Sequence, residues 1–135
     1  MSRLDINKTY KLFIAGAFPR SESGRVYEIK GANKKFIANP AMASRKDLRD
    51  SVVAAKAAQS GWANATAFNR GQILYRIAEI MQGRSEQFVD EICALEGVSN
   101  KAAKIQVAEA IDTWVWYSGW CDKLSSVTGS LNQVS

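Results

Sequence analysis

The chain contains no histidine, and this absence narrows its chemistry more than any other feature of the composition. Catalytic triads with an imidazole base and zinc sites with imidazole ligands are both excluded within its 135 residues. The two cysteines, Cys93 and Cys121, are too few for a disulfide framework, and their spacing matches no metal-binding pattern. No apolar run reaches the ~20 residues that cross a membrane, and the first residues lack the apolar core of a signal peptide. We therefore expect a cytoplasmic location.

The remaining composition is that of an ordinary single globular domain, with 47% hydrophobic and 23% charged residues. The formal net charge is +5, but the basic residues are scattered, and Lys34-Lys35 and Arg45-Lys46 are the adjacent pairs. A nucleic-acid-binding protein more often carries a stripe of Lys and Arg with exposed aromatic side chains. We therefore expect neither a nucleic acid nor a membrane as a partner.

The order of patterns predicts an α+β fold that is mostly α, with an N-terminal β-hairpin followed by about four helices. Residues 10–15 are short, apolar and aromatic, and residues 26–29 alternate at period two, so the two segments are expected to pair as the hairpin. Residues 36–38 are expected to add a short strand before Asn39-Pro40. The single domain, 1–135, then divides into a loose arm 1–9, a β-hairpin region 10–38, a helical region 44–127 and a polar tail 128–135.

Four helix starts are indicated by hydroxyl side chains that precede apolar residues at helical spacing. Ser44 is followed three residues later by Asp47, which is a weaker form of the capping box. Gly61, Gly83 and Gly97 are the expected ends of the first three helices. The four expected N-caps are Ser44, Thr66, Ser85 and Ser99.

The chain is organised around its last and longest helix, expected over residues 101–123, which holds three of the four tryptophans. On a helical wheel of about 100° per residue, one side is a core stripe and the other side is also apolar. The core stripe comprises Ala103, Val107, Ala110, Ile111, Trp114, Tyr117, Ser118 and Cys121. The second side carries Ile105, Trp116 and Trp120, beside Glu109, Asp112 and Lys123.

A helix on the surface of a soluble domain has one polar face, so two apolar sides call for a second covering layer. One interpretation is that both sides pack inside this small domain. The other is that the second side meets something the chain does not contain, which makes Trp116 and Trp120 a candidate partner-facing patch.

We find no constellation that would perform chemistry. No Gly-rich phosphate loop follows a strand, and neighbouring carboxylates such as Asp90 and Glu91 are typical of a solvated helix surface. A nucleophilic cysteine favours the electropositive N-terminus of a helix, whereas Cys121 lies near a predicted C-terminus. We therefore assign no catalytic, cofactor-binding or metal-binding residue within this chain.

Several stretches together resemble the N-terminal portion of an aldehyde dehydrogenase. LFIAGAF followed by VYEI is similar to the opening strand pair of that family, and ANPAMASRKDLRDSVVAAKAAQSGWA is similar to its Asn-Pro segment and Ala-rich first helix. AFNRGQILYRIAEIM and WYSGWCDKL resemble two further family segments, the second of which is the most specific. The resemblance runs from about residue 11 to 130, with local departures such as Trp116, Ser118 and Cys121.

The resemblance implies that a complete enzyme uses NAD or NADP to oxidise an aldehyde to a carboxylic acid, through thiolate attack, hydride transfer and thioester hydrolysis. The segments that carry the family's nucleophilic Cys, general-base Glu, oxyanion-holding Asn and nicotinamide-binding strands have no counterpart here, so we expect this chain to be inactive alone and to bind no cofactor itself. By family geometry, Ile105 and Glu109 would belong to the wall of the substrate tunnel.

Three hypotheses for function remain open. The first is an N-terminal fragment of an NAD(P)-dependent aldehyde dehydrogenase, serving as scaffold. The second is a natural short interaction or oligomerisation module that pairs with itself or completes a split dehydrogenase. The third, which the absence of a recognisable site disfavours, is a small enzyme. The expected partner is a second copy or the remainder of a dehydrogenase.

Overall fold

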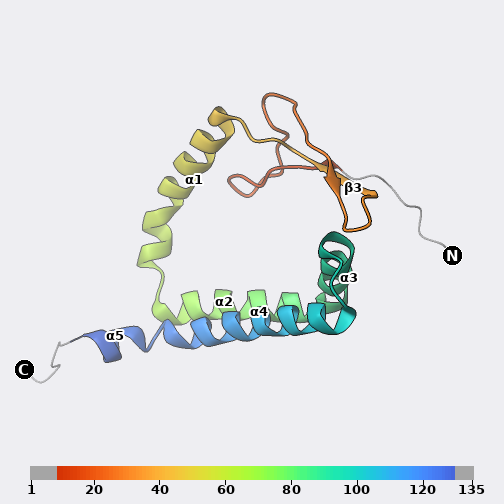
Figure 1. The fold of residues 1–135 in the computed structure, drawn as a ribbon. Coiled ribbons are helices and arrows are strands. Elements are labelled where there is room, and N and C mark those ends of the chain that lie inside the picture. Colours follow the sequence, from red (N-terminus) through yellow and green to blue (C-terminus); the bar gives the residue numbers. More distant parts are fainter. Residues whose placement is uncertain (1–8, 130–135) are drawn as a thin grey trace, which may run out of the picture. The chain divides into compact units, whose positions relative to one another are not determined.

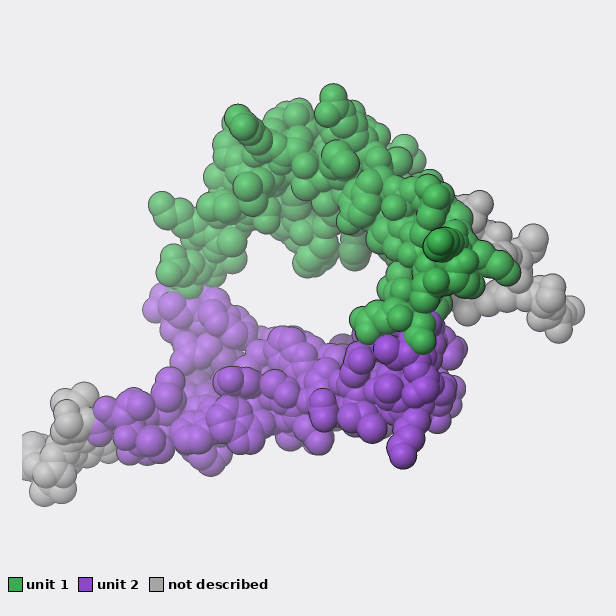
Figure 2. Space-filling model, viewed as in Figure 1, with its two compact units in different colours: residues 1–61, 94–97 green, residues 62–93, 98–135 purple. Residues whose placement is uncertain are grey.

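The computed structural model describes residues 9–129. The chain divides into two compact units (Figure 2). The first comprises residues 1–61 and 94–97, and the second comprises residues 62–93 and 98–135. Of the expected arm at 1–9 and tail at 128–135, all but Thr9, Thr128 and Gly129 lie outside the described residues. The α+β, mostly α fold class is confirmed (Figure 1).

The first unit is built on a three-stranded sheet with the order β1-β3-β2. Strand β3 (Phe36–Pro40) is central; β1 (Thr9–Tyr10) pairs with it in parallel and β2 (Ile29–Lys30) in antiparallel fashion. Ala38, in the middle of β3, is almost fully buried. The last residues of helix α3 (Ser85–Glu96) also join this unit: the Ala32 N–H donates to the Ala94 carbonyl at 3.3 Å. Gly31 is required beside that contact, because a Cβ there would collide with the same carbonyl.

The predicted pairing of residues 10–15 with residues 26–29 is wrong, although a hairpin does form between β2 and β3. Residues 12–19 instead fold back on themselves: Ile14 and Ala17 exchange two backbone hydrogen bonds of 3.0 Å, and Leu12 N–H donates to Pro19 O. Ala15 and Gly16 both have positive φ, 53° and 77°, which is the geometry of a two-residue hairpin turn. This local turn closes before the segment reaches residues 26–29, which pair with the residues around β3.

Helix α1 (Arg45–Asn64) begins as predicted, at Ser44. The Asp47 carboxylate accepts from the Ser44 N–H at 2.8 Å, and the Asp47 N–H donates to the Ser44 hydroxyl at 3.2 Å, which completes a capping box. The same carboxylate accepts from the Ser21 hydroxyl at 2.7 Å and from the Glu22 N–H at 3.3 Å. Asp47 therefore fixes the helix start to the 21–23 loop, and both Ser21 and Asp47 are buried.

Helix α1 does not end where it was predicted to end, and its apolar side is open. The helix continues through Gly61 and Trp62 to Asn64, because glycine lowers helix propensity without preventing a helix. Its apolar side is not buried: Leu48 is 65% exposed, and Val52 and Val53 are exposed to a similar extent. Within the described residues, the apolar side of α1 is therefore left for contacts that the first unit does not supply.

The second unit is a helical assembly in which α2 (Ala67–Gly83) and α4 (Asn100–Trp120) run side by side in opposite directions (Figure 1). Thr66 caps α2 by accepting from the Asn69 N–H, and Ser99 caps α4 by accepting from the Ala102 N–H. Helix α3 (Ser85–Glu96) joins them and ends, as predicted, before Gly97, whose φ is +70°. The buried core comprises Ala78, Val89, Ala103, Val107 and Ile111.

The core stripe of α4 is buried only along its first part. Ala103, Val107 and Ile111 are buried as predicted, whereas Ala110, Trp114 and Tyr117 are exposed. The helix also ends at Trp120, three residues earlier than predicted, and a turn leads to a fifth, short helix, α5 (Leu124–Thr128), which Gly129 follows.

Candidate functional site: the aromatic end of the fourth helix

An aromatic cluster occupies the last two turns of α4. The Trp116 ring lies 4.8 Å from the Tyr117 ring in an edge-to-face arrangement and 5.3 Å from the Trp120 ring in a tilted one. The i, i+4 spacing of the two tryptophans places them on one side of the helix. The three rings in contact therefore form one continuous apolar surface.

The outer face of α4, which we define as Ile105, Glu109, Asp112, Trp116 and Trp120, is open. Ile105 is 50% exposed and Trp116 is 56% exposed, Trp120 is partly buried, and both acidic residues are exposed. The described elements of the second unit pack on the opposite side of α4, so this unit does not bury both sides of the helix as the first interpretation required. The exposure of this face is consistent with the second interpretation, in which the face meets a partner that the chain does not contain.

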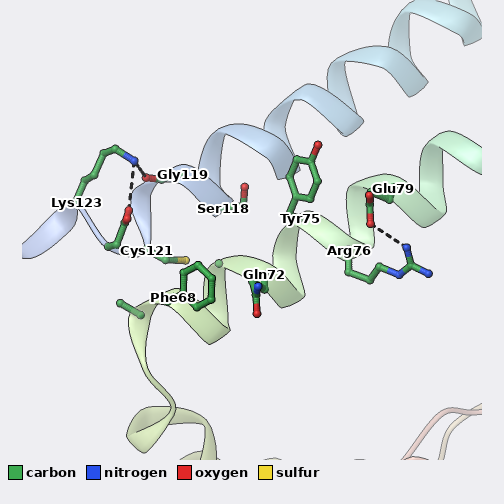
Figure 3. Close-up of a pocket in the computed structure, with 12 residues that line it drawn as sticks. Phe68, Gln72, Tyr75, Arg76, Glu79, Ser118, Gly119, Cys121 and Lys123 are labelled. Carbon is green, nitrogen blue, oxygen red and sulfur yellow. Dashed lines mark hydrogen bonds and ion pairs between the residues drawn. The ribbon is translucent and has the colours of Figure 1, made fainter.

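A groove that the sequence did not reveal lies beside this face, between α2 and the end of α4 (Figure 3). Its volume is about 530 Å³, and its walls combine aromatic side chains such as Phe68 and Tyr75 with small ones. Two exposed ion pairs border it, Arg76–Glu79 at 2.9 Å and Lys123–Asp122 at 3.3 Å. The charges are paired in opposite signs, so the groove does not favour an anion or a cation.

The two helices approach closely at one end of the groove because Gly71 has no side chain. A Cβ at Gly71 would lie 3.0 Å from the Ser118 carbonyl oxygen and 3.6 Å from the Cys121 Cβ. Ser118 itself is held by a 2.6 Å hydrogen bond from its hydroxyl to the Val115 carbonyl. The crossing thus fixes where the aromatic end of α4 rests on α2.

Both cysteines are free and partly buried, in different surroundings. Cys93 packs against the buried core, whereas Cys121 lines the groove, and its thiol lies 3.6 Å from the Tyr117 carbonyl. Among the described residues, no group of three or more His, Cys, Asp or Glu side chains is arranged to hold a metal ion. No helix within residues 9–129 is long and apolar enough to cross a membrane.

Among residues 9–129, one carboxyl group has a clearly displaced pKa, and it lies in the first unit. Hydrogen bonds from the Ser44 N–H, the Ser21 hydroxyl and the Glu22 N–H lower the pKa of Asp47 from 3.8 to about 2. These bonds stabilise the charged form, while partial burial opposes them. A carboxyl held in this way is a structural anchor, because a general acid or base at neutral pH needs a pKa shifted in the opposite direction.

Comparison with known proteins places the chain in a family. The model of the aldehyde dehydrogenase family matches residues 18–134, so the chain belongs to that family. Cytosolic 10-formyltetrahydrofolate dehydrogenase from Mus musculus is 33% identical over 142 residues, which cover 99% of this chain and 15% of that protein. An aldehyde dehydrogenase from Emericella nidulans is 33% identical over 127 residues, which cover 90% of this chain and 25% of that protein. The chain thus spans a quarter or less of the length of these relatives.

Solved structures show the same fold. An NAD-dependent benzaldehyde dehydrogenase from Corynebacterium glutamicum superposes with a TM-score of 0.80 at 25% identity, over 84% of this chain and 25% of that one. An NAD-dependent aldehyde dehydrogenase from Sinorhizobium meliloti gives a TM-score of 0.81 at 20% identity, over 87% and 24% of the two chains. A betaine aldehyde dehydrogenase from Staphylococcus aureus with the same fold was solved in complex with NAD+. The resemblance seen in the sequence is therefore confirmed as an N-terminal aldehyde dehydrogenase segment.

The structure thus brings two of the predicted residues into contact and adds surfaces that the sequence did not indicate. Trp116 and Trp120 are in contact, and Glu109 shares their face, while Ile105 lies earlier on the same helix. The groove and the open side of α1 were missed. The small residue Gly71, opposite the Ser118–Cys121 turn, was the available signal for the groove, since glycine inside a helix often marks a close approach.

Proposed function

We propose that this chain is the scaffold segment of an NAD(P)-dependent aldehyde dehydrogenase and supplies no catalytic group itself. The observation that carries the proposal is the family match over residues 18–134 together with the close structural likeness to dehydrogenases of known structure. Three-quarters or more of each relative lies outside the matched region. We assign the chemistry of aldehyde oxidation to that remainder. The complete enzyme would use NAD or NADP to convert an aldehyde to a carboxylic acid.

In that role, the chain would present the outer face of α4 to the remainder of the enzyme. The exposure of Ile105 and Trp116 supports this, because large apolar side chains at a helix surface gain free energy when another surface covers them. Ile105 and Glu109 would then contribute to the wall of the substrate tunnel, and Trp116 and Trp120 to the packing behind it. We place the complete protein in the cytoplasm.

The test is reconstitution. The purified chain is incubated with NAD or NADP and a panel of aldehydes, and the absorbance of the reduced cofactor is followed. We expect no turnover from the chain alone, and turnover when it is combined with the Emericella nidulans enzyme from which the matching segment has been deleted. Val107→Asp, which should unfold the second unit, is the negative control. Turnover by the chain alone that survives Cys93→Ala and Cys121→Ala would overturn the scaffold role.

A second function, a short module that associates with itself or completes a split dehydrogenase, is favoured by one specific observation. Large apolar side chains are exposed on α1 as well as on α4. Soluble monomers rarely expose extended apolar patches, so these two surfaces call for partners. The molar mass of the purified chain distinguishes the two functions. A scaffold segment without the remainder of the enzyme should be monomeric, whereas a self-associating module should have the mass of two or more copies.

A further inference from the structure

We propose that the exposed side of α1 from one copy of the chain docks on the outer face of α4 from a second copy. The inference rests on the second of the two proposed functions, self-association, and adds the surfaces and the complementarity through which it occurs. The second copy is chosen as the occupant because the two faces are both apolar and carry opposite charge.

The outer face of α4 is apolar and carries two carboxylates at its centre, with Lys101 and Lys123 beyond its two ends. Asp112, Ile105, Trp116, Glu109 and Trp120 follow one another within about 80° on the helical wheel. Glu109 and Asp112 are exposed, and they lie between Ile105 at one end and the tryptophan pair at the other. A surface that covers this face must therefore be apolar and must offer positive charge near its centre, since an unpaired carboxylate is costly to desolvate.

The exposed side of α1 has those two properties. Leu48 and Val52 are 65% and 56% exposed, and Arg45, Arg49 and Lys56 adjoin them on the same side, within about 120° on the wheel. Arg49 is engaged only with its neighbour Asp50 in an exposed pair, which contributes little and is readily exchanged. Helix α1 can thus lay an aliphatic strip on the indole rings while its basic side chains reach the two carboxylates.

Pairing of the outer face of α4 with itself is disfavoured. An antiparallel, two-fold pair that places Trp116 of one copy over Ile105 of the other brings Glu109 opposite Asp112, twice. Like charges that face each other across an interface are destabilising. The heterologous α1–α4 contact avoids this repulsion, and a heterologous contact either closes into a ring or continues from copy to copy.

The test uses charge reversal on each surface separately. Variant A carries Glu109→Lys and Asp112→Lys, and variant B carries Arg45→Glu and Lys56→Glu. All four positions are exposed, so both variants should keep the helix content of the wild type by circular dichroism. Light scattering coupled to size exclusion measures the molar mass of each protein alone and of their equimolar mixture, at about 100 μM, which lies above the dissociation constants of typical specific interfaces.

We expect the wild type to have the molar mass of at least two copies, and this mass should fall towards that of one copy as salt is raised. Variants A and B should each be monomeric alone. Their mixture should associate again. The mixture restores one native α1–α4 contact and one contact with both charges exchanged. Trp116→Asp should also give a monomer with native helix content. A monomeric wild type overturns the proposal and leaves the scaffold role intact. Association that persists in A and B, or a mixture that stays monomeric, overturns the assigned surfaces.

Discussion

Gly71→Ala is the substitution that tests the packing of the two long helices most directly. In a free helix, replacing glycine by alanine adds about 1 kcal/mol of stability, because glycine loses more conformational freedom on folding. At Gly71 the new Cβ would lie 3.0 Å from the Ser118 carbonyl oxygen, which is a backbone atom of α4 and cannot rotate away. Forcing extra volume into a packed contact costs about 1–3 kcal/mol. We therefore expect a net loss of about 0–2 kcal/mol.

Gly119→Ala is the matched control in the same helix pair, because a Cβ at Gly119 would have nothing within 4 Å. It should add up to ~1 kcal/mol. The difference between the two variants, about 1–3 kcal/mol, is the quantity to measure, by urea unfolding followed by circular dichroism. If Gly71→Ala stabilised the chain as much as Gly119→Ala does, the helices would not be in close contact at this point, and the position of the aromatic end of α4 on α2 would be refuted.

Two further predictions concern single side chains. Because the pKa of Asp47 is lowered from 3.8 to about 2, its carboxylate stabilises the first unit at pH values above 3.8, and this contribution is lost as the pH falls towards 2. In an acid titration followed by circular dichroism, the Asp47→Asn variant should therefore lose less stability between these pH values than the wild type. Identical titration curves for the two proteins would contradict the anchor role. Cys121 lines the groove, whereas Cys93 packs on the core. In variants that keep one cysteine each, a thiol reagent should therefore label Cys121 faster than Cys93 in the folded state, and the labelling rate of Cys93 should rise sharply in denaturant. Equal labelling rates of the two thiols in the folded state would contradict this placement.

The helix boundaries were largely predictable because they depend on local chemistry. Ser44, Thr66 and Ser99 cap helices through hydrogen bonds to residues three positions ahead, and Gly97 ends α3 with the positive φ that glycine adopts without strain. The exceptions also have local reasons. Glycine lowers helix propensity without preventing a helix, so α1 passes through Gly61, and a turn after Trp120 ends α4 before the predicted residue.

Strand pairing and burial were less predictable because both depend on residues distant in the sequence. The alternation in residues 26–29 indicated a strand but not its partner. Residues 10–15, the expected partner, instead form part of the compact turn at Ala15-Gly16. The apolar stripe of α4 was identified, but a stripe shows only which side of a helix is expected to be covered. In α4 the stripe is covered by α2 and α3 as far as Ile111, and beyond that point Trp114 and Tyr117 remain exposed. Periodicity alone could not show where the covering layer stops.

The partial cover of α4 leads to a last prediction, about local stability. Amide protons exchange slowly where opening a helix would expose buried apolar groups, and faster where the helix is held mainly by its own hydrogen bonds. Ala103, Val107 and Ile111 are buried, whereas the last two turns rest on α2 chiefly through the Gly71 crossing. In dilute solution, amides of residues 103–111 should therefore exchange more slowly than those of residues 114–120, as measured by mass spectrometry on peptides from the two segments. Raising the protein concentration should slow exchange in the second segment selectively if a second copy covers Trp116 and Trp120. Uniform protection along α4 at low concentration would show that the aromatic end is already as stable as the core, and that its exposed side chains need no partner to hold it in place.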